Sequence, residues 1–236
     1  MSSQNKVYKY DTHVHTSQSS LCAKSKGEEL VEYYASNGYS GFIVTDHFIG
    51  SNNFLAKNER SWEKKICSFY EGYENAKKSA AQIDFDVFFA MEYCYENTEF
   101  IFLNINFEQI LHGQKELEQP NLPEVLNWVH RQGGIVIHVH PFRVTHRINT
   151  VRLLPYFIDA VEVFNGGNVI SWPDANRHAL YYANEIGVSV TSGTDLHSIK
   201  DTITGGMKFT HRIRSEAEFA QAILNNEGRL IQNSLF

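Results

Sequence analysis

The sequence predicts an α/β protein built on a mainly parallel sheet, either open or closed into a barrel. Short apolar segments typical of strands alternate with longer segments whose apolar residues recur at helical spacing, which is the order of βα units. Strand after strand also ends in an ionisable residue. No repeat, low-complexity tract or Pro/Gly/Ser-rich linker divides the chain, so residues 1–236 are expected to form a single domain.

The first half of the chain begins with a short strand at residues 7–10 and a helix at 27–37, which Gly38 ends. The run GFIVT predicts a strand at 41–45. A long helix is expected within residues 59–82, because large apolar residues recur there every three or four positions. Two further apolar runs, FDVFFAM and FIFLNI, predict strands at 85–91 and 100–105.

The second half repeats the pattern. Strands are expected at residues 135–139, 160–164 and 188–191, and helices at 123–132, 174–186 and 215–225. Pro123 suits the first turn of a helix, where its missing N–H costs nothing. Ser215 followed by Glu218 is typical of a capping box, which begins the last helix.

Composition excludes several classes of protein. Hydrophobic residues make up 42% of the 236 residues and charged residues 20%, which supports a packed core and excludes global disorder. The net charge of −6 argues against a dedicated non-specific nucleic-acid binder. No apolar run approaches a membrane span, and the first ten residues lack a signal pattern. The three scattered cysteines favour a reducing compartment over a disulfide framework, so a cytoplasmic location is expected.

The polar residues at the strand ends predict a shared site. They are His13, His15, Asp46, His47, Glu92, His140, Asn165, Asp195 and His197. In a parallel barrel the carboxyl ends of the strands lie on one face, where active sites occur. These segments, far apart in the sequence, are therefore expected to converge on one cavity.

The residue types at these ends indicate metal binding. Alternate residues of a strand point to the same side, so His13 and His15 form one pair, and Asp195 and His197 another. A carboxylate such as Glu92 has two oxygens and can bridge two cations. Mixed imidazole and carboxylate ligands suit Zn, Mn or Fe, and the cysteine pattern excludes an all-Cys structural zinc site.

Motifs along nearly the whole chain resemble the PHP (polymerase and histidinol phosphatase) superfamily. They are DTHVHT (11–16), VTDH (44–47), AMEY (90–93), IVIHVHPFR (135–143), DAVEVFNGG (159–167), SGTDLHS (192–198) and GGMKF (205–209). The chain is most similar to stand-alone bacterial PHP-type metal-dependent phosphoesterases. This resemblance implies a distorted (β/α)7 TIM-like barrel in a single domain, with two or three divalent metal ions at the C-terminal strand ends.

The resemblance also implies the ligands. The metal-binding positions are His13, His15, His47, the bridging carboxylate Glu92, His140 directly before Pro141, Asp195 and His197. His138 shares the strand parity of His140 and is expected to lie deeper, in a supporting position behind the ligands. Asp46 is a candidate for orienting a neighbouring ligand.

Two family positions differ in this chain. Where many relatives have an acid or histidine shortly after the H-x-H pair, this chain has Ser20 and Leu21, followed by Cys22. Where another histidine commonly follows the strand after the bridging glutamate, it has Asn104 and Asn106. Two ions are therefore expected more firmly than three. It stays open whether Cys22 or one of the asparagines replaces the missing ligands.

The function implied by the resemblance is metal-dependent hydrolysis of phosphate esters by a metal-activated hydroxide, most simply on a small phosphorylated molecule. Arg143 is expected to act in catalysis and substrate binding by pairing with the phosphate, and Asn165 and Arg177 are further substrate-binding candidates. The loop at residues 48–54 is expected to overhang the cleft. The alternatives are a phosphodiesterase or exonuclease on short nucleic acids, a phosphotyrosine phosphatase, and a non-catalytic metal-binding PHP domain. No membrane partner is expected, and the oligomeric state is left open.

Overall fold

The computed structural model describes residues 6–119, 121–145, 148 and 150–232, and its strands form a nine-stranded sheet in the order β7-β6-β5-β4-β3-β2-β1-β8-β9. The first five residues, on which the expected lack of a signal pattern partly rests, lie outside this description. The strands are β1 (Tyr8–Val14), β2 (Gly41–Val44), β3 (Asp86–Tyr95), β4 (Thr98–Leu103), β5 (Ile135–His138), β6 (Ala160–Asn165), β7 (Ser189–Gly193), β8 (Gly205–Phe209) and β9 (Arg229–Gln232).

The sheet curls so far that its edge strand β7 returns to β1. The backbone N–H of Asp195, just after β7, donates to the carbonyl of His13 at 2.9 Å, and the Thr12 hydroxyl donates to the carbonyl of Ser192 at 3.0 Å. Asp11 joins the same two strands, because its carboxylate accepts from both the N–H and the hydroxyl of Thr194. The result is a nearly closed barrel, which confirms the expected α/β barrel.

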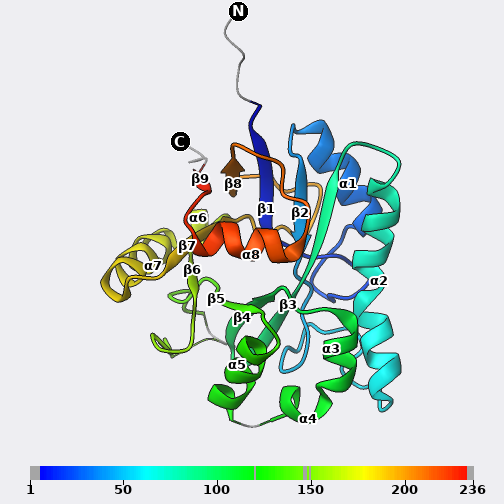
Figure 1. Ribbon diagram of the computed structural model, residues 1–236, viewed down its shortest axis with the longest axis vertical. Helices are drawn as coiled ribbons and strands as arrows, with labels where there is room; N and C mark the ends of the chain where they lie inside the picture. Colours follow the sequence, from blue (N-terminus) through cyan, green and yellow to red (C-terminus); the bar gives the residue numbers. More distant parts are fainter. Residues whose placement is uncertain (1–5, 120, 146–147, 149, 233–236) are drawn as a thin grey trace, which may run out of the picture.

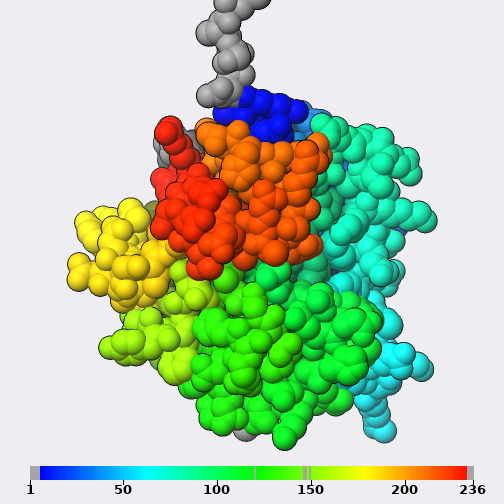
Figure 2. All heavy atoms as spheres, in the orientation of Figure 1, coloured from blue at the N-terminus to red at the C-terminus, as the bar shows by residue number. Residues whose placement is uncertain are grey.

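Helices cover the outside of the barrel and one of its openings (Figure 1). They are α1 (Gly27–Ser36), α2 (Trp62–Ala80), α3 (Phe107–His112), α4 (Gln114–Leu117), α5 (Leu122–Arg131), α6 (Asn168–Ser171), α7 (Pro173–Ile186) and α8 (Glu216–Leu224). Helix α8 lies across the opening at the amino ends of the central strands, where Phe219 and Ile223 pack with Ile43 and Phe88 inside the barrel. In Figure 2 the red and orange atoms of this C-terminal part cover the middle of that face.

The barrel interior has an apolar layer and a polar layer. Inward-facing residues in the apolar layer include Ile43, Phe88, Ala90, Ile101, Leu103, Ile135 and Ile137. Because alternate residues of a strand face the same side, Glu92 on β3 and Glu99 on β4 continue these inward rows toward the other end of the barrel. Helix α8 and the apolar layer therefore close one end and leave the polar layer at the other.

The expectation of a mainly parallel sheet is wrong, because the described strands form four parallel and four antiparallel pairs. Strand β4 runs antiparallel to both β3 and β5, and β8 runs antiparallel to β1 and β9. Strands β3 and β4 form a hairpin whose two turn residues, Glu96 and Asn97, have φ of 46° and 63°, as two-residue hairpin turns require. The strict alternation of strand and helix is broken there, and β8 and β9 were not predicted as strands.

The helix boundaries follow local chemistry. The Ser215 hydroxyl accepts from the Glu218 N–H at 3.1 Å, which confirms the predicted cap of α8. In a capping box the Glu218 carboxylate would accept from the N–H of Ser215. Here it accepts from the N–H of Arg214, so the capping box is incomplete. In the part of the chain that the structure describes, no helix is long and apolar enough to cross a membrane.

Candidate metal centre

His13 and His15 point to the same side of the chain, as predicted, and a β-bulge turns that side toward the centre. Tyr10 packs inside the barrel, and regular alternation would turn His13 outward. The register of β1 against β2 shifts between Asp11 and Val14, which reverses the alternation. The Nε2 atoms of His13 and His15 consequently lie 3.2 Å apart, and both side chains are fully buried.

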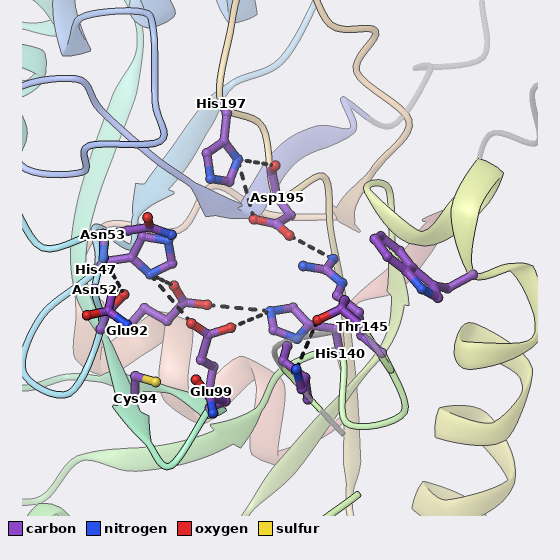
Figure 3. Close-up of a pocket in the computed structure, with 15 residues that line it drawn as sticks. His47, Asn52, Asn53, Glu92, Cys94, Glu99, His140, Thr145, Asp195 and His197 are labelled. Atoms are coloured by element: carbon purple, nitrogen blue, oxygen red, sulfur yellow. Dashed lines mark hydrogen bonds and ion pairs between the residues drawn. The ribbon is translucent and has the colours of Figure 1, made fainter. Parts of the chain in front are cut away.

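Glu92 lies at the centre of the cluster. Its Oε1 is 3.2 Å from His13 Nε2 and 3.6 Å from His140 Nε2, and its Oε2 is 3.7 Å from His15 Nε2. Oε2 also contacts the Nδ1 atom of His47 directly. Figure 3 shows Glu92 between His47 and His140. One carboxylate therefore contacts four of the predicted ligands.

The positions of His140 and Asp195 at the centre do not follow from the alternation of side chains along a strand. Both lie beyond the ends of their strands, and their backbones are in the left-handed region, with φ of 31° and 57°. This conformation is unfavourable for residues other than glycine and often marks functional positions. It turns Asp195 Oδ1 to within 3.2 Å of His15 Nε2, whereas His197 lies farther along, with its Nδ1 at 2.8 Å from the Asp195 carbonyl oxygen.

The expected place of His138 behind the ligands is wrong. Its ring stacks on Phe100 at a centroid distance of 4.8 Å and lies edge-on to Tyr182, both in the outer core. Ile135 and Ile137 face the barrel interior, so His138 must face outward, and only the turn after β5 brings His140 back to the centre. Burial lowers the pKa of His138 to about 3, so it is a neutral core residue.

Glu99 is a site residue that the sequence analysis missed. Its Oε2 lies 3.5 Å from His140 Nε2, and its Oε1 lies 3.8 Å from His47 Nδ1. The antiparallel direction of β4 brings the start of that strand, rather than its end, to the centre. Asn104 and Asn106 follow the other end of β4 and bond to Gly133 and Gln109, so the structure does not place them near the ligands.

Glu162 is a second missed residue, and it holds two of the ligands. Its Oε1 lies 2.9 Å from His13 Nδ1, and its Oε2 accepts from the backbone N–H of His140 at 3.1 Å. Carboxylates in this position fix the ring orientation of a metal-binding histidine and increase its basicity. The only sequence signal was a lone acid inside the apolar run AVEVF.

Replacing Glu162 with glutamine is expected to weaken metal affinity by about 10–100-fold without unfolding the barrel. The amide removes the charge opposite His13, and its NH2 group faces the N–H of His140 or the amide of Asn165, which already donate to Oε2. Competition with a fluorescent chelator measures the affinity. The exposed Glu185, replaced in the same way on α7, is the control. Equal affinities for the two variants would contradict the positioning role.

Asp46 supports the centre, as the sequence analysis suggested. It accepts from the N–H of Thr16 at 2.7 Å and from the Ser20 hydroxyl at 2.7 Å. The same Ser20 oxygen accepts from the N–H of His47 at 3.0 Å and lies 3.5 Å from His15 Nδ1. Ser20 thus helps to orient two predicted ligands.

Arg143 is held firmly at the edge of the centre. Its Nη2 donates to Asp195 Oδ2 at 2.8 Å and to Asn165 Oδ1 at 2.6 Å, and its Nε donates to Asn168 Oδ1 at 2.7 Å. Trp172 lies against the guanidinium, 5.6 Å from the ring centroid to Cζ. Among the hydrogen bonds between described residues, none uses Nη1, so this edge is available to a ligand.

Of the other two substrate-binding candidates, one is buried beside Arg143 and the other is exposed. Asn165 is fully buried and joins Arg143 to Glu162, so it positions the arginine. Arg177 has a side chain that is 62% exposed and pairs with Asp174 on its own helix. It is not among the residues that line the cavity over the centre.

The centre opens into a cavity of about 240 Å³. Its walls include Ser51, Asn52 and Asn53, so the middle of the 48–54 loop does overhang the cleft. The ends of that loop, Phe48 and Phe54, are buried in the core and anchor it. Arg143 is the one Lys or Arg among the described residues that line this cavity.

The electrostatics of the cluster are dominated by burial and by close opposite charges. Burial would raise the pKa of Glu92, but the surrounding imidazoles, His47 first, hold it well below its usual range. The pKa of Asp195 is also held low against burial, by His13 and Arg143. The pKa of Glu99 is raised, by burial and by the nearby charge of Glu92. The centre therefore concentrates carboxylate charge that a cation can neutralise.

The donor set fits divalent cations. Four groups offer ligand atoms that lie within 4.8 Å of one another, and they are His13/His15/Glu92, His13/His140/Asp195, His47/Glu92/Glu99 and His15/His47/His197. The contacts between Glu92 and the imidazoles lack hydrogen-bond geometry, so His47 Nδ1 and both Glu92 oxygens are buried without a hydrogen-bond partner among the described residues. Such orphaned groups are unfavourable unless an ion satisfies them.

Comparison with known proteins gives the same fold. Neither a family profile nor a curated protein sequence matches the chain. A two-domain protein from Bacteroides vulgatus ATCC 8482 that contains a predicted PHP-like metal-dependent phosphoesterase matches with a TM-score of 0.69 and 15% identity, over 97% of this chain and 65% of that one. The chain thus spans slightly less than two thirds of that protein.

Two further crystal structures agree. A candidate metal-dependent phosphoesterase from Bifidobacterium adolescentis ATCC 15703 matches with a TM-score of 0.54 and 16% identity, over 92% of this chain and 95% of that one. An amidohydrolase from Chromobacterium violaceum, solved with sulfate and without metal, matches with a TM-score of 0.60 and 14% identity, over 93% and 97%. The fold that the sequence resemblance implied is therefore confirmed.

Proposed function

We propose that the protein is a metal-dependent hydrolase of phosphate esters, and that it acts on the monoester of a small molecule. The observation that carries this proposal is the convergence of imidazole and carboxylate groups on Glu92, directly beside a fixed arginine. The two proteins of the same fold that are described as metal-dependent phosphoesterases support it.

The proposal assigns metal binding to residues of all four ligand groups. They are His13, His15, His47, Glu92, His140, Asp195 and His197, as expected from the motifs, together with Glu99. Two or three divalent ions, Zn, Mn or Fe, suit this mixture of nitrogen and oxygen ligands. Such ions, when bound, make water acidic enough to supply hydroxide near neutral pH and offset the charge of the phosphate.

The residues of the chain supply orientation and charge. Arg143 presents its Nη1 edge to the phosphate, while Asp195, Asn165 and Asn168 keep the guanidinium from rotating. A phosphate monoester carries more negative charge than a diester, so a fixed arginine favours the monoester. The amides of Asn52 and Asn53 offer neutral hydrogen bonds to the rest of a substrate within the cavity.

The proposal is tested by metal analysis followed by hydrolysis of p-nitrophenyl phosphate and bis-p-nitrophenyl phosphate, each with added Mn or Zn. We expect bound metal and faster turnover of the monoester. Faster turnover of the diester would favour the phosphodiesterase or exonuclease alternative. Bound metal without turnover of either compound would favour a non-catalytic domain. Phosphotyrosine, as free amino acid and in a peptide, distinguishes a phosphotyrosine phosphatase from an enzyme for smaller esters.

A further inference from the structure

One part of the metal centre has a donor that the motifs did not assign. His15, His47 and His197 each offer a ring nitrogen within 4.8 Å of the others, and the ring of His15 lies 4.4 Å from each of the other two rings. The sulfur of Cys22 is 3.1 Å from His197 Nε2 and also interacts with the ring of His47. Three imidazoles therefore gather at this end of the centre, and the thiol of Cys22 lies beside two of them, those of His197 and His47.

The position of Cys22 is fixed by the backbone around it. The N–H of Lys24 donates to the carbonyl of His197 at 2.7 Å, and the N–H of Leu21 donates to the carbonyl of Asn53 at 2.7 Å. The N–H of Ala23 bonds back to the Ser20 carbonyl at 3.1 Å. These bonds attach the loop to the segment that carries His197. The backbone therefore holds Cys22 beside the His197 imidazole.

The opposite end of the centre has a different character. There His140 meets two carboxylates, Glu92 and Glu99. Carboxylate oxygens suit harder cations such as Mn²⁺, whereas thiolate with imidazole suits zinc. The two ends therefore differ in the softness of their donors.

We propose that Cys22 is a metal ligand, and that with His197 and His47, the two imidazoles beside its sulfur, it forms a zinc-selective position in this centre. Imidazole nitrogen and thiolate sulfur are the donors that zinc prefers in tetrahedral sites. The carboxylate-rich position at Glu92 and Glu99 would then accept a harder ion. This inference rests on the proposed metal centre, but it concerns the identity of the ions and not the reaction.

Cobalt spectroscopy tests the proposal independently of catalysis. The full chain, stripped with a chelator and titrated with Co²⁺, is expected to develop the sulfur-to-cobalt charge-transfer band in the near ultraviolet. The variant Cys22→Ser should lose that band and bind one zinc ion at least about tenfold more weakly. The matched control is Cys67→Ser, because Cys67 is exposed on α2 and should leave both the band and the affinity unchanged.

A second measurement uses the unaltered protein, in case the serine variant does not fold. One equivalent of Zn²⁺ should slow alkylation of Cys22 by iodoacetamide at least tenfold while leaving the alkylation of Cys67 unchanged, as read by peptide mass spectrometry. The assignment is overturned if the fully loaded protein shows no charge-transfer band, if the band survives in Cys22→Ser, or if zinc gives Cys22 no protection. A chain that shows the band yet hydrolyses no ester would refute the proposed function and leave this ligand assignment intact.

Discussion

Replacing Glu92 with glutamine is expected to abolish phosphate-ester hydrolysis and to remove at least one bound ion per chain. Glu92 contacts four imidazoles, and it belongs to two of the four groups that could hold an ion. Loss of a metal removes several kcal/mol of stabilisation from the charged transition state. That corresponds to a fall of about 10³-fold or more in kcat.

The measurement combines metal analysis with turnover of p-nitrophenyl phosphate at saturating substrate. Glutamine has nearly the same shape as glutamate, so the circular dichroism spectrum should stay unchanged. Because an ion that binds only the folded chain stabilises it, a chelator should lower the melting temperature of the original protein more than that of the variant. Glu108→Gln is the control, since its side chain is 73% exposed on α3. Full metal content and full turnover in Glu92→Gln would refute the assigned centre.

Arg143→Ala is expected to lower kcat/KM for a phosphate monoester by about 10²–10³-fold, with metal content unchanged. This range is typical for removal of one preorganised donor from a buried site. The guanidinium has three fixed hydrogen-bond partners, so its free edge is already oriented before substrate binds. Diester hydrolysis should fall less, because a diester presents less negative charge to the arginine.

The contrast with Arg177→Ala makes this prediction specific. Both arginines were substrate-binding candidates in the sequence, but Arg177 is exposed and pairs with Asp174 on α7. Its replacement should leave kcat/KM unchanged within error. Equal effects of the two replacements, or a loss of metal in Arg143→Ala, would mean that Arg143 supports Asp195 and does not bind the phosphate.

Much of the fold follows from local patterns in the sequence. Apolar runs predicted β1 to β7, and helical spacing with capping residues predicted α1, α2, α5, α7 and α8, because these signals depend on neighbouring residues. The direction of β4 could not be predicted in the same way. An apolar run has the same pattern in either direction, and the hairpin at Glu96 and Asn97 lacks the glycine that usually signals such a turn.

The antiparallel direction of β4 also decides which residues lie at the candidate site. Asn104 and Asn106 were considered as replacements for a missing ligand because they follow β4 in the sequence. The antiparallel pairing moves them away and brings Glu99 to the centre instead. The parity argument for His138 was wrong for a related reason, because β5 ends before His140 and a left-handed residue redirects the chain.

The sequence by itself determined the chemical class of the centre, because its imidazoles and carboxylates directly follow recognisable strands and parallel strand ends share one face. Only the tertiary structure decided which further groups join them. Glu99, Glu162 and the thiol of Cys22 reach the ligands through a reversed strand, an inward row of the barrel and a loop attached to His197. Those contacts join residues distant in the chain, and no local periodicity records which distant backbones will meet.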